Sequence, residues 1–167
     1  MNRIVVMVVS VILTLVVAAP LAFAQSQGGA PETVDETPFV LPPLGDKHAL
    51  PAACEFPVLV ESSGKQKALE LPGERIIFIF PDYYVTLTNV DEPTNQVTLN
   101  VTGSLHQTTL ENGNEVTVVT GRNLLGDPKA GFVLAVGTFS YVFDAKDRLI
   151  QPLTGEGQLT DVCTLLS

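Results

Sequence analysis

The chain has 167 residues with 9 basic and 18 acidic side chains, which gives a formal net charge of −9. Because the acidic residues are spread along the chain, this charge disfavours nucleic acid and anionic membranes as partners. The length suits one domain with a single core rather than two domains.

The first 24 residues have the layout of a secretory signal peptide. A short start with Arg3 is followed by an apolar run at residues 4–17 and by the small-x-small sequence Ala-Phe-Ala at 22–24. The run is short for a bilayer span, which needs about 20 apolar residues, and Pro20 interrupts it before the cleavage signal. We expect residues 1–24 to be removed and the mature protein to be secreted and extracellular, with no membrane anchor. An uncleaved anchor is the alternative.

Residues 25–53 predict a flexible, proline-rich leader. They contain five prolines and no periodic apolar face, and proline removes backbone donors and restricts the residue before it. A second possibility is that the leader docks on the domain as an extended strap through its few apolar residues, which are Phe39, Val40, Leu41 and Leu44.

Residues 54–167 predict one all-β domain. Several runs alternate apolar and polar residues with period two and are rich in β-branched and aromatic residues, as half-buried strands are. The clearest runs lie at 83–90, 96–103, 115–120 and 138–144, and "RIIFIF" at 75–80 is apolar on both faces, which indicates a central strand. We expect a single antiparallel β-sandwich or β-barrel of about 8–10 short strands, closed by one disulfide.

The alternation changes phase at Gly137. The two sets of large apolar residues with opposite parity on either side of it are Phe132, Leu134 and Val136, and Phe139, Tyr141 and Phe143. A bulge or a sharp corner of the sheet at Gly137 would place both sets on one face. Beyond them, Asp144 and Asp147 predict a hairpin turn, with a Ca²⁺ contact as the weaker alternative.

Residues 120–131, "TGRNLLGDPKAG", contain three glycines and a proline. Gly121 and Gly126 have the spacing of a phosphate-binding loop, but Asp127-Pro128 stands where that motif has Lys and Ser or Thr, and an acidic side chain repels phosphate. We predict that the stretch is instead a connection between two strands, with a turn starting at Asp127-Pro128. Its adjacent leucines, Leu124 and Leu125, are expected to fold back and cover one open end of the sheet.

The sequence holds two cysteines, Cys54 and Cys163, near the two ends of the predicted domain. In an oxidising compartment such a pair predicts one disulfide, and two buried free thiols are the alternative. Together with His48 and His106 the cysteines supply four potential zinc ligands. None of the paired close spacings of zinc sites is present, so we expect no metal site.

The candidate ligand-binding residues are His106, Arg122 and Asn123. Arg122 and Asn123 follow a predicted strand at a loop mouth, where binding residues on β-scaffolds often lie. The structural alternatives are an ion pair between Arg122 and a carboxylate, a turn cap at Asn123, and a cross-strand hydrogen bond of His106.

The hairpin register decides whether His106 and Arg122 share a face. A two-residue Asn112-Gly113 turn, which that dipeptide favours, pairs His106 with Val119 and puts Arg122 on the opposite face. A three-residue loop pairs His106 with Thr120 and puts Arg122 diagonally beside it. The favoured turn weakens a joint site.

Four stretches of the domain resemble small secreted bacterial β-proteins of unassigned function. They are "CEFPVLVESSGK", "VTLNVTGSLHQTT", "VTVVTGRNLLGDPKAGFVLAVGTFSYVFD" and "QPLTGEGQLTDVC", and they cover nearly all of residues 54–163. The resemblance implies an exported domain with a terminal cysteine pair, and it assigns no activity and no catalytic residue. The pattern of strands and glycine corners is also similar to closed β-barrels of the allene-oxide-cyclase and dirigent type, an analogy of fold alone.

We expect a secreted, non-catalytic β domain that acts as an extracellular binding or interaction module for an unknown ligand or surface. The sequence contains no catalytic constellation and no cofactor motif, so we expect no catalytic residue and no cofactor. The alternative is a β-barrel enzyme or carrier for a small apolar molecule, whose cavity would be lined by Phe78, Phe80, Tyr83, Phe132, Phe139, Tyr141 and Phe143. The ligand and the oligomeric state are not predicted.

Overall fold

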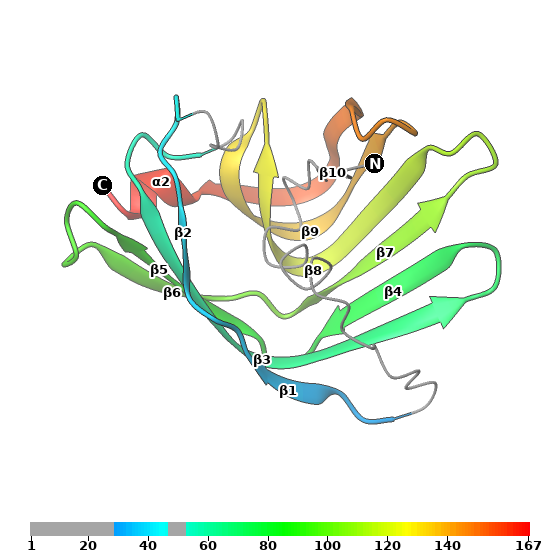
Figure 1. Cartoon of the computed structure of the whole chain (residues 1–167), viewed down its shortest axis with the longest axis horizontal. Helices are drawn as coiled ribbons and strands as arrows, with labels where there is room; N and C mark the ends of the chain where they lie inside the picture. The colour runs from blue at the N-terminus through cyan, green and yellow to red at the C-terminus, as the bar shows by residue number, and fades with distance from the viewer. Residues whose placement is uncertain (1–28, 47–52) are drawn as a thin grey trace.

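The computed structural model describes residues 29–46 and 53–167. The signal-peptide prediction for residues 1–24 and His48 lie outside these residues. The described parts contain ten strands and one short helix (Figure 1). The elements are β1 (Glu32–Asp35), β2 (Phe39–Leu41), β3 (Val58–Leu71), β4 (Arg75–Phe80), β5 (Tyr84–Asn89), β6 (Gln96–Asn100), β7 (Gly103–Thr109), β8 (Glu115–Asp127), β9 (Gly131–Phe143), β10 (Leu149–Asp161) and α2 (Val162–Leu165). Among the described residues no helix is long and apolar enough to cross a membrane.

All ten strands belong to one antiparallel sheet, which confirms the predicted all-β antiparallel fold. The main order is β10-β9-β8-β7-β4-β3-β5-β6, and β1 and β2 also pair with β3. The described strands do not close into a barrel, because β6 pairs with β5 alone and β10 with β9 alone. Several strands are longer than expected, with 13 or 14 residues in β3, β8, β9 and β10.

Strand β3 divides the sheet into two wings. Its residues 58–63 pair with β5 and its residues 67–71 pair with β4, with Gly64 between the two parts. We call the first part of β3 with β1, β2, β5 and β6 wing A, and the second part with β4 and β7–β10 wing B. Figure 1 shows the sheet strongly curved between the two wings, and buried apolar side chains of both wings form one core cluster.

Wing A follows the alternation that its sequence predicts. In β5, Val85 and Leu87 are buried, whereas Tyr84, the first residue of the strand, is 41% exposed. In β6, Leu99 is buried and Thr98 is exposed. Burial of alternate apolar side chains is the main favourable term for such strands, and it places them where the period-two pattern predicts.

In wing B, β4 has the central position predicted from its apolar sequence, between β3 and β7. Phe80 at its end is buried and contacts Tyr83 edge to face, with ring centroids 5.5 Å apart. This contact lies where the chain leaves β4 for β5, so it joins the cores of the two wings.

Four glycines lie in register across the strands β7 to β10. Gly103 is opposite Gly121, Gly121 is opposite Gly137, and Gly137 is opposite Gly157. We call them the glycine row. A Cβ atom on Gly137 would lie 2.3 Å from the backbone oxygen of Glu156, and its φ of +143° is one that other residues rarely adopt. The strands therefore approach too closely here for a side chain, and Figure 1 shows β9 and β10 curving strongly.

The corner predicted at Gly137 is present, and the bulge alternative is wrong. The β8–β9 pairing runs through Gly137 without a register shift. The predicted change of phase is not present, because Val133 and Ala135, which share the parity of Phe139 and Tyr141, are 1% exposed. Before Gly137 both parities are buried, since Leu134 also belongs to the core.

Residues 120–131 are not the connection that the sequence predicts. β8 continues through Gly121 and Gly126, both of which pair with residues of β9, and only residues 128–130 turn the chain. The prediction failed because glycines that serve a bent ladder look the same in the sequence as glycines of a loop.

The turn itself begins at Asp127-Pro128, as predicted. Asp127 is buried, and its Oδ1 accepts hydrogen bonds from the backbone N–H groups of Lys129 (2.8 Å) and Ala130 (2.9 Å). Its Oδ2 accepts a third, from the N–H of Leu153 in β10 (2.8 Å). The carboxylate therefore ties the turn to β10, a strand that pairs with β9 and not with β8. Buried polar groups need such partners.

The predicted disulfide between Cys54 and Cys163 is confirmed, with Cα atoms 5.4 Å apart. It joins the segment just before β3, which contains Cys54, to α2, which follows β10 and contains Cys163. Asp161 caps α2 by accepting from the N–H groups of Cys163 and Thr164. Leu166 after the helix is buried, and its backbone oxygen accepts a hydrogen bond from the Asn89 side chain (3.1 Å), so the C-terminus is fixed to wing A.

The described part of the leader docks on the domain. β1 pairs with residues 63–66 of β3, and β2 pairs with residues 58–60. Of the two possibilities that the sequence left open, docking as a strap therefore holds for residues 32–41. We call residues 29–46 the strap.

Candidate functional site

The β7–β8 hairpin has a loop that neither sequence alternative predicted. Thr109 pairs with Glu115, and the backbone N–H of Leu110 donates to the backbone oxygen of Asn114 (2.8 Å). Gly113 takes the left-handed conformation, with φ of +78°, and closes the turn. A longer loop with glycine in this position is a common hairpin solution, and Asn-Gly alone does not distinguish it from the two-residue turn.

This register pairs His106 with Val118, so the expected pairing with Val119 is wrong. By the alternation along β8, Thr120 and Arg122 now lie on the same side of the sheet as His106. His106 and Arg122 can therefore belong to one site, although they are not direct neighbours.

The hydroxyl groups of Ser104 and Thr120 form a chain of hydrogen bonds that starts at His106 and runs in the direction of Arg122. Ser104 Oγ lies 3.2 Å from His106 Nε2 and 2.7 Å from Thr120 Oγ1. Thr120 is two residues before Arg122 in β8, just before the glycine row. We call His106, Ser104, Thr120 and Arg122 the polar row. It offers a cation at one end, an imidazole at the other and hydrogen-bonding hydroxyls between them.

Arg122 is held by the backbone rather than by an acid. Its Nε donates to the backbone oxygen of Asn100 (2.8 Å), and among residues 29–46 and 53–167 the only ion pair joins Arg148 to Asp144. The alternative of an Arg122–carboxylate pair is thus not what the described residues form. Arg122 is half-buried, whereas the other two described arginines, Arg75 and Arg148, are exposed.

Asn123 does not share the surface of the polar row. It is buried, and its Nδ2 donates to the backbone oxygen of Thr120 (3.0 Å). A Cβ atom on Gly103 would lie 2.9 Å from this nitrogen, so Asn123 packs against the glycine row. Its position indicates a structural role close to the turn-cap alternative.

A second polar group, which the sequence analysis did not single out, lies on the core side of wing B. Thr117 is paired with both Gln107 and Tyr141, and Glu115 begins the same strand two residues earlier. Burial raises the pKa of Glu115, while a hydrogen bond from Gln107 lowers it and the nearby Asp147 raises it. Burial likewise raises the pKa of Tyr141, whose hydroxyl is close to that of Thr117. The only signal in the sequence was that Glu115 has the same position in the alternation of its strand as the buried residues Thr117 and Val119.

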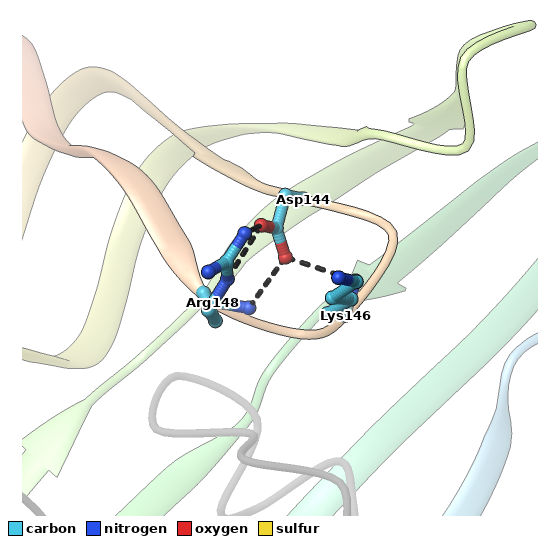
Figure 2. A network of polar contacts seen from close by, with 3 residues as sticks. All are labelled: Asp144, Lys146 and Arg148. Atoms are coloured by element: carbon cyan, nitrogen blue, oxygen red, sulfur yellow. Dashed lines mark hydrogen bonds and ion pairs between the residues drawn. The ribbon is translucent and has the colours of Figure 1, made fainter.

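The turn between β9 and β10 is built around Asp144, as Figure 2 shows. Its Oδ1 accepts from the backbone N–H groups of Lys146 (2.9 Å) and Arg148 (3.0 Å), and its Oδ2 accepts from Arg148 Nε (2.7 Å). The hydrogen bond from the Arg148 side chain is the main reason that the pKa of Asp144 is lowered to about 2. The hairpin-turn prediction is confirmed, and in the described ranges no group of three or more His, Cys, Asp or Glu side chains is arranged to hold a metal ion.

Comparison with protein families, with curated proteins and with solved structures gives no match to this chain. Of the three candidate ligand-binding residues, the structure places His106 and Arg122 on one side of wing B and turns Asn123 inward.

Proposed function

We propose that the chain is a secreted binding module, and that the polar row recognises a ligand with an anionic or strongly accepting group. Arg122 carries this proposal, because it is a half-buried cation held by the Asn100 carbonyl, with no acidic partner among the described residues. In a chain with twice as many acidic as basic side chains, leaving such a cation without an acid favours an external partner.

The geometry of the row suits recognition by several hydrogen bonds. A guanidinium binds a carboxylate or phosphate with two parallel N–H groups. The Nε of Arg122 already donates to Asn100, which fixes the side chain and leaves its terminal N–H groups to meet a ligand. Ser104 and Thr120 add hydroxyls that act as donor or acceptor, so an acidic sugar or a small carboxylate fits the row.

The contact between Ser104 and His106 has the spacing of a nucleophile beside a base. Catalysis would also need a group that orients the imidazole and donors for a developing oxyanion. Among the described residues, the one side chain that hydrogen-bonds to His106 is Ser104, and Ser104 also hydrogen-bonds to Thr120. This arrangement favours binding over acyl transfer.

The proposed location is supported by the oxidised cysteine pair, since disulfides persist mainly in oxidising compartments. The alternative function, a β-barrel enzyme or carrier for a small apolar molecule, requires a closed barrel with a cavity. In the described strands the sheet is open, and Phe80, Tyr83, Phe139 and Tyr141 are buried in its core, so the binding module is the better supported function.

A ligand screen on residues 25–167 tests the proposal. We expect stabilisation in thermal unfolding by members of a set of carboxylates, phosphate esters and acidic sugars, with salt weakening the effect because the contact is ionic. For any ligand found, Arg122→Ala should weaken binding at least about tenfold, which corresponds to about 1.4 kcal/mol.

Arg75→Ala is the matched control. Arg75 also donates from Nε to a backbone oxygen, that of Pro72 (3.0 Å), but it is exposed on β4 and outside the polar row. Equal losses for the two variants would mean a non-specific charge effect and would reject the site. A ligand whose affinity is unchanged in Arg122→Ala would also reject it.

A further inference from the structure

Three segments of the chain meet at the junction between the two wings. Glu36 of the strap follows β1, and its backbone N–H donates to the backbone oxygen of Ser62 in β3 (3.3 Å). Tyr83 lies in the turn between β4 and β5, and its backbone packs against Gly64, since a Cβ atom on Gly64 would lie 2.6 Å from the Tyr83 Cα atom. We call Glu36, Ser62 and Tyr83 the junction cluster, because docking of the strap brings these three residues together.

The polar atoms of the junction cluster are buried but only partly paired. Tyr83 is 1% exposed and Ser62 is 8% exposed. Ser62 Oγ donates to Glu36 Oε2 (2.8 Å), whereas Glu36 Oε1 and the Tyr83 hydroxyl are buried with no hydrogen-bond partner among the described residues. Buried polar atoms in folded proteins are nearly always paired with protein, with water or with an ion. Two unpaired oxygens in one buried cluster therefore point to an occupant from solution.

The cluster contains a carboxylate without a positive partner. Glu36 forms no ion pair within the part of the chain that the structure describes. Of the basic residues in β3, Lys65 is exposed, and Lys67 donates to a backbone oxygen of the strap. Two exposed acids, Glu61 and Asp82, adjoin the cluster in the sequence and add negative charge. A buried charge is costly unless an opposite charge compensates it, so the cluster favours a positively charged occupant.

The atoms of the cluster that remain unpaired are oxygens. Ser62 uses its proton for Glu36, so the lone pairs of its hydroxyl are left. Burial raises the pKa of Tyr83, against a hydrogen bond from Ser62 that lowers it, and the nearby Glu36 carboxylate raises it further, so the Tyr83 hydroxyl stays neutral and offers an oxygen.

A set of oxygen ligands suits a hard cation, and a single carboxylate balances a single positive charge. Divalent cations are usually bound by more than one acid, and the described ranges hold no group of three or more His, Cys, Asp or Glu side chains arranged for a metal. A water molecule would supply hydrogen bonds to Glu36 and Tyr83 but would leave the carboxylate without an opposite charge. The chemistry of the cluster therefore favours a monovalent cation.

We propose that the junction cluster binds a small monovalent cation, of the class of Na⁺, K⁺ or ammonium, through Glu36 Oε1, the Tyr83 hydroxyl oxygen and Ser62 Oγ. The strap supplies the charged ligand, and the domain supplies the two neutral ones. Cation binding and docking of the strap therefore favour each other, and the cation fixes the strap to the junction of the two wings. The inference does not depend on the polar row, which lies on wing B.

Thermal unfolding of residues 25–167 in chloride salts of equal ionic strength tests the site. In at least one of the sodium, potassium and ammonium salts, we expect a midpoint at least about 3 °C above that in tetramethylammonium chloride, whose cation is too large for the cluster. The difference should be lost in Glu36→Gln, which removes the charge, and in Tyr83→Phe, which removes the hydroxyl. Both variants keep the size of the side chain.

Glu32→Gln and Tyr84→Phe are the matched controls. Glu32 is an exposed acid on β1, and Tyr84 is 41% exposed at the start of β5. Each control makes the same chemical change as its partner variant, next to the junction cluster but outside it. Both should keep the full dependence on the cation.

Hydrogen exchange of the wild type in the same salts gives a second measurement that needs no variant. The amides of β1 should exchange at least about tenfold more slowly in the stabilising salt than in tetramethylammonium chloride, and those of β6, on the far side of wing A, should change much less.

Equal midpoints in all four salts would overturn the proposal and would leave a bridging water or a protonated Glu36 as the occupant of the cluster. A dependence on the cation that persists in Glu36→Gln and Tyr83→Phe would be a general salt effect and would overturn it, as would protection spread evenly over all strands. Stabilisation by Ca²⁺ or Mg²⁺ and by none of the monovalent cations would also contradict it.

Discussion

The two halves of β8, before and after Gly121, differ in which of their faces are buried. Before Gly121, burial alternates, with Thr117 and Val119 buried and Val118 half-buried. After it, five consecutive residues, 123–127, are buried. The first half presents one face to the core and the other to the outside, and the second half is covered on both.

The glycine row is the boundary between these two halves of the strand. Because Gly121 and Gly137 are opposite each other in an unbroken ladder, the hydrogen bonds of the strand continue although the direction of the sheet changes. A strand that passes through such a corner loses its period-two signal without ending. Residues that fill the second half, Asn123 and Asp127 among them, then look like loop residues.

The most damaging change that we expect is Gly137→Ala. The new Cβ atom would lie 2.3 Å from the Glu156 oxygen and 2.8 Å from the Gly157 Cα atom, and the φ of +143° is strained for alanine. Moving two paired backbones apart should cost more than about 4 kcal/mol of unfolding free energy. Gly131→Ala, in the same hairpin, has a φ of +81° but no atom within 4 Å of its Cβ, so about 1 kcal/mol is expected from conformation alone. Urea unfolding of both variants measures the difference, and similar costs would show that conformation rather than close approach makes the corner.

Leu125→Asp should be the next largest effect. Leu125 is 2% exposed and belongs to the second half of β8, so an unpaired carboxylate there should destabilise the fold by about 3–5 kcal/mol. Leu110→Asp is the control, because Leu110 is 42% exposed in the β7–β8 loop and should change stability by about 0.5 kcal/mol at most. A mild Leu125→Asp variant in thermal and urea unfolding would mean that the second half of β8 does not belong to the cooperative core.

Much of the fold was predictable, because wing A keeps one alternation per strand. Val85, Leu87 and Leu99 lie where their parity puts them, and the cysteine pair needed only an oxidising compartment and two positions near the domain ends. The burial of Leu124 and Leu125 was expected from their hydrophobicity, although as part of a loop.

The site was less predictable, because it depends on register. A shift of one residue at the Asn112-Gly113 hairpin moves Arg122 to the other face relative to His106, and the local sequence favours the wrong turn. The contacts of Ser104 with His106 and Thr120 follow only from the observed pairing. Glu36 and Tyr83 are 47 positions apart in the sequence, so no spacing rule brings them together.

A smaller effect separates two carboxyl groups by the sign of their pH dependence, that of Glu115 at the start of β8 and that of Asp144 in the nearby turn after β9. The pKa of Glu115 is raised in the folded protein, mainly by burial, so its favourable contribution is present below the unfolded pKa and is lost as pH rises through the folded value. Glu115→Gln should therefore become more stable relative to wild type as the pH rises above the unfolded pKa of about 4.

Asp144 should behave in the opposite way. Its pKa of about 2 lies below the unfolded value because Arg148 stabilises the carboxylate, so its contribution is present above the unfolded pKa and is lost as the pH falls toward 2. Asp144→Asn should lose stability relative to wild type at neutral pH and approach it in acid. Unfolding midpoints measured at several pH values for both variants would contradict the assignment if the two differences changed in the same direction.

The smallest stability effect should come from Arg122→Ala, although Arg122 lies next to the glycine row. The side chain donates one hydrogen bond to a backbone oxygen and makes no ion pair among the described residues, so its removal should change the unfolding free energy by less than about 1 kcal/mol. Arg122 is half-buried at the junction of the two halves of β8, directly after Gly121 and one residue before the buried run 123–127. Thermal unfolding of Arg122→Ala and Leu125→Asp in the same buffer compares the two halves directly.

If Arg122→Ala were the more damaging of the two, Arg122 would be a structural charge that the corner needs, and the polar row would no longer be a site whose function is separable from folding. If its stability is nearly unchanged while a ligand from the screen is lost, the first half of β8 is the part of the strand that binds and the second half is the part that holds the sheet together.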